Sequence, residues 1–239
     1  MRSLCVVLVV GLLLIGLEAR AKCAGEWVGV APANDVELPS QPQVLVTLGG
    51  RFQKVELVND LEFVAGAQRV AVEVVSQFSG YSQVVALLKP VKALPPARWA
   101  LTLKKTSKQQ LGRALGSWQV GKTVDSVAPM FTGTPSAGET SWAEFGCGPA
   151  STLEVKGVAM SEPNAFVEAK VTVDGKTETA VFSPKEAVLD LGHGMCSGAF
   201  ALNPGVTATV VFTPVDVSGN RGASSAPVTF KAPGPTKAP

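Results

Sequence analysis

The chain has 239 residues, of which 46% are hydrophobic, 17% are charged and 6% are aromatic, and its formal net charge at pH 7 is +2. A net charge so close to zero provides no overall field for binding nucleic acid or an acidic membrane surface. Val, Ala, Thr, Gly and Pro are common while Met, Tyr and His are scarce, which favours strands and turns over helices. The length allows two domains of about 100 residues each.

The N-terminal segment has the pattern of a secretory signal peptide. Arg2 supplies a basic start, residues 4–17 form an apolar run of about 14 residues, and Ala19-Arg20-Ala21 is a small-x-small cleavage site. We therefore predict that residues 1–21 are removed on export to the periplasm, the cell surface or the medium. The mature chain would then have no transmembrane segment.

Two alternatives concern the same segment. A retained membrane anchor needs about 20 apolar residues, more than this run provides. A lipid anchor is suggested by Cys23, which follows the cleavage site, but a lipidated cysteine needs a small residue before it and Lys22 stands there. The residues therefore favour cleavage without lipidation.

From Trp27 onward, short apolar runs with two-residue alternation are separated by turns rich in Gly, Pro and Ser, a pattern typical of β-strands. The strands expected in the first half are 43–48, 52–58, 70–77, 83–88, 99–103 and 117–120. One helical turn is expected at 108–115. Ser126–Pro129 has the composition of a linker, so we place the first domain at 22–127.

Basic residues gather between positions 89 and 122, with no acidic residue among them: Lys89, Lys92, Arg98, Lys104, Lys105, Lys108, Arg113 and Lys122. Lysines on exposed strands protect the edges of sheets, which is the structural explanation. An anionic partner such as a cell-envelope polysaccharide is the functional alternative. The stretch lacks the interleaved aromatic residues that would indicate nucleic acid.

The strands expected in the second half are 152–160, 166–173, 177–182, 187–191, 199–202, 207–213 and 228–231. Short strands spaced about 8–12 residues apart predict a β-sandwich. Asp174-Gly175 is expected to form a tight hairpin turn, because glycine accepts the positive φ that such turns need. We place this domain at 128–231, and expect the Pro-rich residues 232–239 to form a disordered tail.

Cys5 leaves with the signal peptide, so the mature chain keeps Cys23, Cys147 and Cys196. We predict a disulfide between Cys147 and Cys196, which would close a loop of about 50 residues and stabilise the second domain by about 4 kcal/mol on the chain-entropy model. Cys23 would then be free, modified or bonded to another molecule. The alternative joins Cys23 to one of the later two cysteines and links the domains covalently.

Few residues could carry chemistry. His193 is the one histidine of the chain, so a nucleophilic triad would have to be built around it. His193, Met195 and Cys196 form a weak candidate copper site, because imidazole, thioether and thiolate all suit copper. The structural explanation is a loop whose cysteine forms a disulfide. The sequence has no nucleophile elbow, phosphate-binding glycine loop or zinc-binding helix motif, whereas two catalytic carboxylates could come from distant strands.

The four tryptophans are the largest apolar side chains, and we expect Trp27, Trp99, Trp118 and Trp142 to pack in the cores. Trp27 and Trp142 flank predicted strands, so an exposed contact surface is their alternative role. Gly80-Tyr81-Ser82 is a candidate contact site at a loop tip.

Two stretches carry a resemblance to known families. FTPVDVSGNRGASSAPVTF, residues 212–230, resembles the last hairpin of bacterial Ig-like domains, with Asp216, Gly219 and Asn220 at the places of its D-x-x-G-N turn. VAPANDVELPSQPQVLVTL and KALPPARWALTL resemble the Ig-like module of bacterial surface-layer proteins. Together these resemblances cover most of the mature chain, and they imply an all-β protein of two tandem Ig-like antiparallel β-sandwiches after a cleaved signal peptide.

The D-x-x-G-N turn has two explanations. Asp can hydrogen-bond the backbone ahead of it, and Gly and Asn tolerate the left-handed conformation that reverses the chain, so Asp216, Gly219 and Asn220 are expected to form a hairpin turn. The alternative is a calcium site, but Asp216 and Asn220 alone offer far fewer than the roughly six to eight oxygen ligands that calcium takes.

The opening of the first half also resembles periplasmic copper-resistance proteins of Ig-like topology, which implies a metal-binding alternative. Those proteins use a histidine near the mature N-terminus, and this chain has none there.

The sequence thus predicts an exported, non-enzymatic binding or structural module of the bacterial cell envelope that needs no cofactor. Its expected partner is a cell-envelope protein or polysaccharide rather than nucleic acid. A periplasmic copper-binding protein of Ig-like topology is the first alternative, and an accessory domain or a hydrolase that uses carboxylates is the second.

Overall fold

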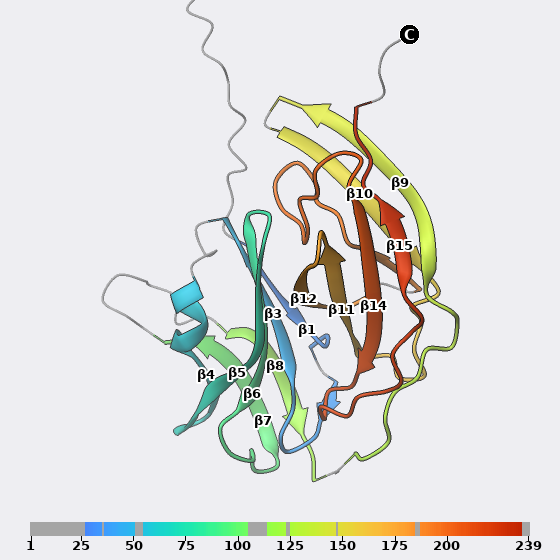
Figure 1. Ribbon diagram of the computed structural model, residues 1–239. Coiled ribbons are helices and arrows are strands. Elements are labelled where there is room, and N and C mark those ends of the chain that lie inside the picture. Colours follow the sequence, from blue (N-terminus) through green and yellow to red (C-terminus); the bar gives the residue numbers. More distant parts are fainter. Residues whose placement is uncertain are drawn as a thin grey trace, which may run out of the picture.

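The structure is a computed structural model that describes residues 27–34, 36–50, 55–104, 114–122, 125–146, 148–184 and 187–235. These residues form an all-β structure (Figure 1), as the sequence predicts. The described ranges contain no α-helix, and their 3₁₀-helix η2 spans Val55–Asp60. None of their helices is long and apolar enough to cross a membrane. The predicted signal peptide, Cys23, Cys147 and residues 236–239 lie outside these ranges.

The N-terminal half, residues 27–122, forms one eight-stranded sheet with the order β1-β3-β6-β5-β4-β7-β8-β2. Its strands are β1 (Trp27–Ala31), β2 (Glu37–Leu38), β3 (Val44–Gly49), β4 (Leu61–Ala65), β5 (Gln68–Gly80), β6 (Gln83–Pro90), β7 (Ala97–Leu103) and β8 (Ala114–Val120). Neighbours pair antiparallel except β2 and β8, which run parallel. The strand β5 is shared between two layers, since its start pairs with β4 and its remainder with β6 across a bulge at Val74/Ser76. A bulge bends the strand, so the sheet folds around its own core.

Tryptophan side chains dominate this first core. Trp99 and Trp118 have 0% exposure, and the indole Nε1 of each donates a hydrogen bond, to the Pro95 carbonyl at 2.9 Å and to the Pro32 carbonyl at 3.1 Å. A buried indole needs such an acceptor for its N–H. The expected core packing is confirmed for these two side chains. It is wrong for Trp27, which is 38% exposed, while Trp142 is partly exposed on a strand of the other half.

The C-terminal half, residues 125–235, holds two further sheets. The first has the order β13-β10-β9 and the second β12-β11-β14-β15. Their strands are β9 (Ser136–Phe145), β10 (Gly148–Lys156), β11 (Phe166–Val173), β12 (Lys176–Phe182), β13 (Val188–Asp190), β14 (Thr207–Val215) and β15 (Val228–Lys231). A second apolar core lies between these sheets, with Leu153, Val155, Val167 and Phe212 inaccessible or nearly so.

The turn between β11 and β12 is the hairpin that the sequence predicts. Val173 pairs with Lys176, and Asp174 and Gly175 between them have φ of 47° and 76°. Two consecutive positive φ values are typical of the tight turns whose twist matches that of the flanking strands.

The two halves lie side by side and share apolar contacts (Figure 1). Leu45 and Val85, on the outer face of β3 and β6, form a buried cluster with Phe166 and Val181 of β11 and β12. Alternation along each strand explains this, because residues 44 and 46 face the first core while residue 45 faces the other way. The outer face of β3 and β6 is therefore buried against the C-terminal half.

The β5–β6 hairpin adds a second contact between the halves. Phe78 packs in the core of the C-terminal half, with its ring 4.7 Å from that of Phe200. Tyr81 accepts a backbone hydrogen bond from Gly198 at 3.0 Å and donates one to the Ala199 carbonyl at 3.3 Å. The tip of the hairpin is therefore tied to the loop that precedes Phe200.

Several expected elements differ from the structure. Residues 55–58, expected in a strand at 52–58, belong to η2, and residues 114–115, expected in a helical turn at 108–115, belong to β8. The expected strand 199–202 is absent, because Ala199 and Phe200 donate their backbone N–H groups to Gly192 and Leu191 of the preceding loop. The strands β1, β2, β4 and β9 were not expected.

Candidate functional site

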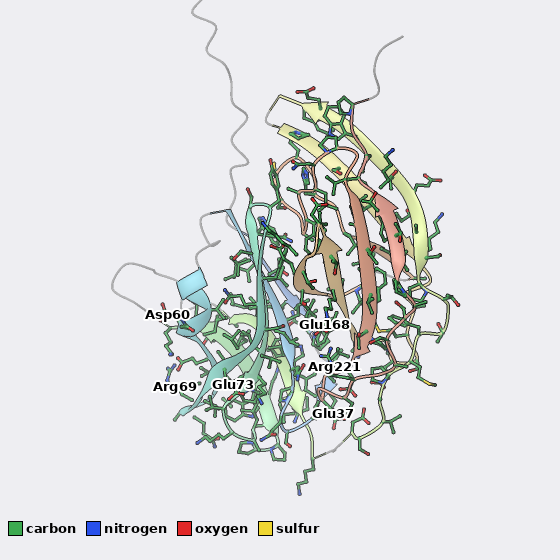
Figure 2. All side chains as sticks on the ribbon, in the orientation of Figure 1. Glu37, Asp60, Arg69, Glu73, Glu168 and Arg221 are labelled. Carbon is green, nitrogen blue, oxygen red and sulfur yellow. The ribbon has the colours of Figure 1, made fainter. Side chains whose placement is uncertain are left out.

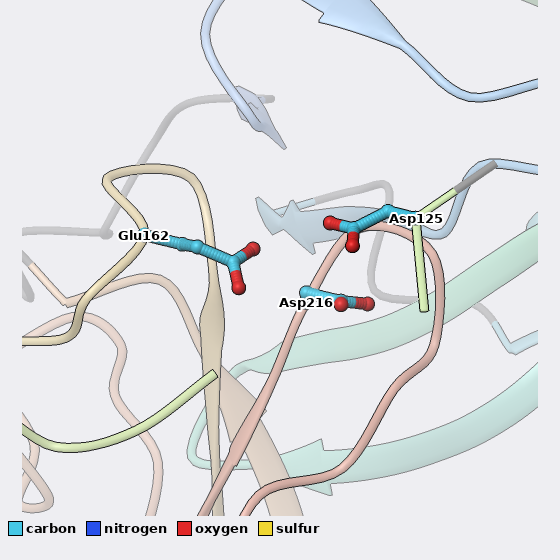
Figure 3. Close-up of side chains that lie close together, drawn as sticks. All are labelled: Asp125, Glu162 and Asp216. Atoms are coloured by element: carbon cyan, nitrogen blue, oxygen red, sulfur yellow. The ribbon is translucent and has the colours of Figure 1, made fainter. Parts of the chain in front are cut away.

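Three carboxylates meet where the two halves join (Figure 3). Asp125 lies in the connection after β8, Glu162 in the connection between β10 and β11, and Asp216 directly after β14. One carboxylate oxygen from each residue lies within 4.8 Å of the other two. Segments far apart in the sequence thus bring three acidic groups to one place, which we call the acidic junction.

Asp216 is the fixed member of the acidic junction. It has 0% exposure, and its Oδ1 accepts hydrogen bonds from the backbone N–H groups of Ser218 and Asn220, both at 2.8 Å. Its Oδ2 accepts a further one from Asn220 Nδ2 at 2.7 Å. Gly219 has φ of 89°, and a Cβ there would lie 2.5 Å from Gln43 Nε2 of the other half. The D-x-x-G-N sequence therefore makes a tight turn that needs glycine for its conformation and for its close packing.

The same turn holds the connection between the halves. Asn220 Nδ2 also donates to the backbone carbonyl of Asp125 at 2.9 Å, and Asp125 Oδ1 accepts the N–H of Val127 at 2.9 Å. Gln43 donates its backbone N–H to the Val217 carbonyl at 2.6 Å. One turn thus contacts the linker and the N-terminal half together, which fixes the position of the Asp125 carboxylate.

Glu162 is a member of the acidic junction whose ionised form is disfavoured. Its pKa is raised above the ordinary value, first by desolvation and then by the negative charges of Asp216 and Asp125. Burial and nearby negative charges both disfavour the ionised form of a carboxyl group. A proton on Glu162 relieves this repulsion, and so would a bound cation.

The ligand chemistry of the acidic junction selects the kind of cation. Carboxylate and carbonyl oxygens suit Ca²⁺, Mg²⁺ or Mn²⁺, whereas copper prefers imidazole, thioether or thiolate. Asp125, Glu162 and Asp216 would be the protein ligands, with the remaining positions left to water or backbone oxygens.

Sequence reasoning found one member of this cluster and missed two. Asp216 was recognised because its hydrogen-bond donors lie within four residues, inside one motif. Asp125 stands in the stretch predicted as a linker and Glu162 precedes Pro163, and neither has a local sequence motif that marks it. Their proximity follows from the packing of the linker against the β10–β11 connection, where Met130 and Ser161 exchange hydrogen bonds.

His193 lies far from this cluster in the fold, beside the β5–β6 hairpin tip. It is 5% exposed, its Nδ1 is 2.9 Å from the Gly194 carbonyl, and its ring stacks on Tyr81 with 4.3 Å between centroids. The candidate contact site Gly80-Tyr81-Ser82 is thus used within the molecule.

Cys196 is disulfide-bonded, and the other cysteines of the chain lie outside the described residues. A sulfur in a disulfide is not the thiolate that the candidate copper site requires. Tyr81, which stacks on His193, also lies 3.2 Å from where a Cβ of Gly148 would stand. The loop of Cys196 therefore lies near the sequence neighbour of Cys147, and the Cys147–Cys196 bridge stays a prediction.

The basic stretch is spread over several strands. Lys89 Nζ lies 2.8 Å from Glu73 Oε1, Arg98 donates to Ser117 Oγ at 3.0 Å, and Lys104 donates to the Asn59 carbonyl at 3.3 Å. Lys105, Lys108 and Arg113 lie outside the described residues. Other charged side chains also pair, such as Arg221, in the connection after β14, with Glu168 of β11 (Figure 2). Lys89 on β6 and Arg98 on β7 belong to interior strands, so their partners within the molecule explain them better than protection of a sheet edge does.

Comparisons with known proteins leave the family open. No protein-family model matches the chain, and no curated protein matches it. Among solved structures, a β-1,2-glucanase from Parabacteroides distasonis is similar at 13% identity over 90% of this chain and 32% of that chain, with a TM-score of 0.34. This chain thus spans about a third of the length of the glucanase.

Two further solved structures match over nearly their whole length. A chimeric titin Z1Z2 has 14% identity over 89% of this chain and 100% of that chain, with a TM-score of 0.27. Fibronectin(III)-like modules of Clostridium thermocellum CbhA have 10% identity over 87% and 94%, with a TM-score of 0.22. TM-scores this low carry no argument about function, which has to come from the residues.

Proposed function

We propose that this chain is an exported, non-enzymatic binding or structural module of the bacterial cell envelope. In this proposal residues 1–21 are a cleaved signal peptide, and residues 22–127 and 128–231 are two tandem Ig-like sandwiches. The tail predicted at 232–239 is wrong for Ala232, which is buried and exchanges backbone hydrogen bonds with Val206 and Gly205. The observation that carries the proposal is the union of the two halves through the shared apolar cluster, the β5–β6 hairpin and the acidic junction. A buried apolar contact between the halves opposes their relative motion, which suits a rigid scaffold that presents its surfaces.

The strand order supports the Ig-like part of the proposal. If the two-residue strand β2 is left out, the seven remaining strands of the N-terminal half can be lettered A to G in chain order. The order β1-β3-β6-β5 then reads A-B-E-D, and β4-β7-β8 reads C-F-G. This corresponds to the ABED and CFG sheets of an immunoglobulin fold. The C-terminal half has seven strands in sheets of three and four, as compact Ig-like sandwiches do.

The geometry of the acidic junction does not support a hydrolase that uses its carboxylates as catalysts. Asp216 is fully buried, and all its hydrogen bonds hold its own turn. A catalytic carboxylate has to reach the scissile bond of its substrate. Asp216 therefore fits a structural role.

Cell fractionation and intact mass test the proposal directly. The full-length protein, expressed in a bacterium with a C-terminal tag, should appear in the exported fraction with the mass of a chain that begins at Lys22. A variant with Leu12→Arg and Leu13→Arg in the apolar run should stay inside the cell at full mass. A full-mass wild-type protein in the cytoplasm would contradict the proposal.

The acidic junction favours a second role, the binding of a hard divalent cation that stiffens the connection between the halves. At 5 mM Ca²⁺ and a Kd of about 0.5 mM, within the range of extracellular calcium modules, binding would stabilise the fold by about 1.4 kcal/mol. For a chain of this size, that raises Tm by about 3–6 °C relative to protein in EDTA.

Scanning calorimetry of the mature protein measures this shift. Glu162→Gln and Asp125→Asn should each abolish most of it, whereas Glu178→Gln, at an exposed position on β12, should leave it unchanged. Equal Tm values in Ca²⁺, Mg²⁺ and EDTA would reject the cation role and leave the export proposal untouched.

A further inference from the structure

A groove of about 450 Å³ lies between the two halves, away from the acidic junction. Its floor is the outer face of β1, β3 and β6, and residues 181–183 at the end of β12 form a wall. The volume falls within the range of small-molecule sites, roughly 300–1,000 Å³. The groove therefore has the size and the position between sheets that are common for ligand sites.

The register of the strands sets the floor in two rows. Trp27 lies opposite Gly49, and Gly49 lies opposite Gln83 on the next strand. Two residues further along, Gly29 lies opposite Thr47, which lies opposite Val85. Residues two apart on a strand face the same side, so these side chains share one surface. The absence of a side chain at Gly29 leaves this surface low beside the indole of Trp27, which covers Gly49.

Trp27 is held as a fixed platform. A Cβ at Gly49 would lie 2.1 Å from Trp27 Cε2, so the indole rests directly on the backbone of β3. The side chain nevertheless keeps 38% of its surface exposed, and it lines the groove. One side of the ring is therefore covered by the protein while other surface is available to an occupant.

The chemistry of the lining is neutral and mixed. No described residue that lines the groove is ionisable, and the polar ones are Thr47, Gln83 and Ser183. A charged occupant would be desolvated here without a compensating charge, which is unfavourable. A purely aliphatic occupant would leave the amide and hydroxyl groups without hydrogen bonds. The lining therefore matches a neutral molecule that has both an apolar face and hydroxyl groups.

The floor of the groove is rigid because it continues into the interface between the halves. Leu45, Val85 and Val181 line the groove and also belong to the apolar cluster that joins the halves. A surface that is already ordered loses little conformational entropy on binding. The groove is thus preformed, and its shape depends on the two halves staying together.

We propose that this groove binds a neutral saccharide unit of a glycan, with a pyranose C–H face stacked on Trp27 and its hydroxyl groups hydrogen-bonded by Gln83, Thr47 and Ser183. Sugars combine an apolar C–H face with a polar rim, which is the combination that the lining offers. This inference rests on the proposed function, since it supplies the binding site of an envelope module and names its class of ligand.

The chain offers a steric test that spares the fold. Gly29 does not have a positive φ, and the nearest atom to a Cβ there would be Thr47 Cβ at an ordinary 3.7 Å. Gly29→Leu should therefore fold normally while its side chain fills the floor of the groove. Gly146→Leu, with open space around its Cβ, is the matched control, and Trp142→Ala is the control for Trp27→Ala.

The experiment is isothermal titration of the mature protein with neutral gluco-, manno- and galacto-hexasaccharides and with an anionic hexagalacturonide. We expect at least one neutral probe to bind, with affinity lowered about tenfold or more by Gly29→Leu and by Trp27→Ala and unchanged by the two controls. Absence of binding by every neutral probe, equal binding by Gly29→Leu, or preference for the anionic probe would overturn the inference.

Co-sedimentation with purified cell envelope separates this inference from the proposed function. Binding of the envelope that Gly29→Leu retains in full would reject the groove while the envelope role stands. A wild-type protein that neither binds the envelope nor is exported would remove the proposed function itself.

Discussion

At the scale of single residues, the acidic junction balances hydrogen bonding against charge repulsion. The carboxylate of Asp216 is stabilised by three donors in its own turn, so its negative charge is well solvated by the protein. Glu162 enters the same space with no such donor among the described residues, and its pKa rises through burial and through the charges of Asp216 and Asp125. The turn thus stabilises the fold, while an ionised Glu162 opposes it.

This difference predicts a pH dependence of stability in metal-free protein. Because the pKa of Glu162 is raised when the chain is folded, the folded state holds a proton that the unfolded chain releases. The stabilisation is present below pH 4.5, the ordinary value, and is lost as the pH rises through the folded pKa. Glu162→Gln stays neutral at every pH, so its Tm should equal the wild-type value near pH 4 and exceed it at pH 7.5.

Scanning calorimetry in EDTA at the two pH values measures this effect. Glu178→Gln, on the exposed side of β12, controls for the loss of one negative charge. A Glu162→Gln variant that is less stable than the wild type at pH 7.5 would show that the ionised carboxylate is stabilising, against this account.

Replacement of Asp216 should lower the stability of the fold, whereas replacement of Glu162 should raise it at pH 7.5. Asp216→Ala leaves the N–H groups of Ser218 and Asn220 without their acceptor in a buried turn, so we expect a loss of about 2–4 kcal/mol in the free energy of unfolding. Urea denaturation at pH 7 measures it. Asp174→Asn in the exposed β11–β12 turn is the control and should change stability by less than about 0.5 kcal/mol. A similar small loss for Asp216→Ala would mean that water replaces the carboxylate.

The residue scale also shows which site features can be predicted from sequence. Asp216 and Gly219 belong to a turn whose donors and acceptors are close in the chain, and such local chemistry leaves a motif. Asp125 and Glu162 acquire their role through packing between distant segments, for which a single sequence has no signal. Trp27 was expected in a core, but its indole lies over Gly49 on the outer face of the sheet and stays 38% exposed.

At the scale of elements, the long strand β5 and its hairpin with β6 connect the two halves. Phe78, near the end of β5, belongs to the core of the C-terminal half, and Tyr81 at the tip stacks on His193. An element of the first half thereby contributes to the second core. Stability of the C-terminal half is therefore expected to depend on side chains of β5.

Phe78→Ala tests this dependence. Removal of a buried phenylalanine from a core costs about 3–5 kcal/mol, and we expect that loss to appear in the C-terminal half. Hydrogen exchange should show faster exchange of the backbone amides of β10 and β14, while those of β7 and β8 keep their protection. Val75→Ala, at a position 44% exposed on the same strand, is the control. Unchanged protection of β10 and β14 in Phe78→Ala would contradict the shared core.

The pattern of hydrophobic residues predicts strands well where at least one face is buried, as in β11 and β14, and where both faces are buried, as in β3 and β6. It fails for β9, whose residues are mostly exposed and therefore show little alternation. It also fails at 55–58, where apolar residues precede β4 in a 3₁₀ turn that leads Leu61 and Phe63 into the core. Alternation of apolar and polar residues shows which face of a strand is buried, so a strand such as β9 with both faces exposed leaves little pattern in the sequence.

At the scale of the whole molecule, the interface between the two halves determines how they are arranged. The outer residues of β3 and β6 form the contact between the halves at one end and the floor of the groove at the other. Sequence reasoning predicted the strands but assigned no role to their outer apolar residues. Which sheet faces meet depends on the full topology, so the groove and the acidic junction could be found only in the assembled fold.

Co-sedimentation of the mature protein, residues 22–239, with purified cell envelope from the producing bacterium tests the central claim most directly. The account predicts saturable binding that moves most of the protein into the pellet, and that excess soluble envelope polysaccharide reverses. Protein that stays in the supernatant at every envelope concentration would contradict the claim that this chain is a binding module of the envelope.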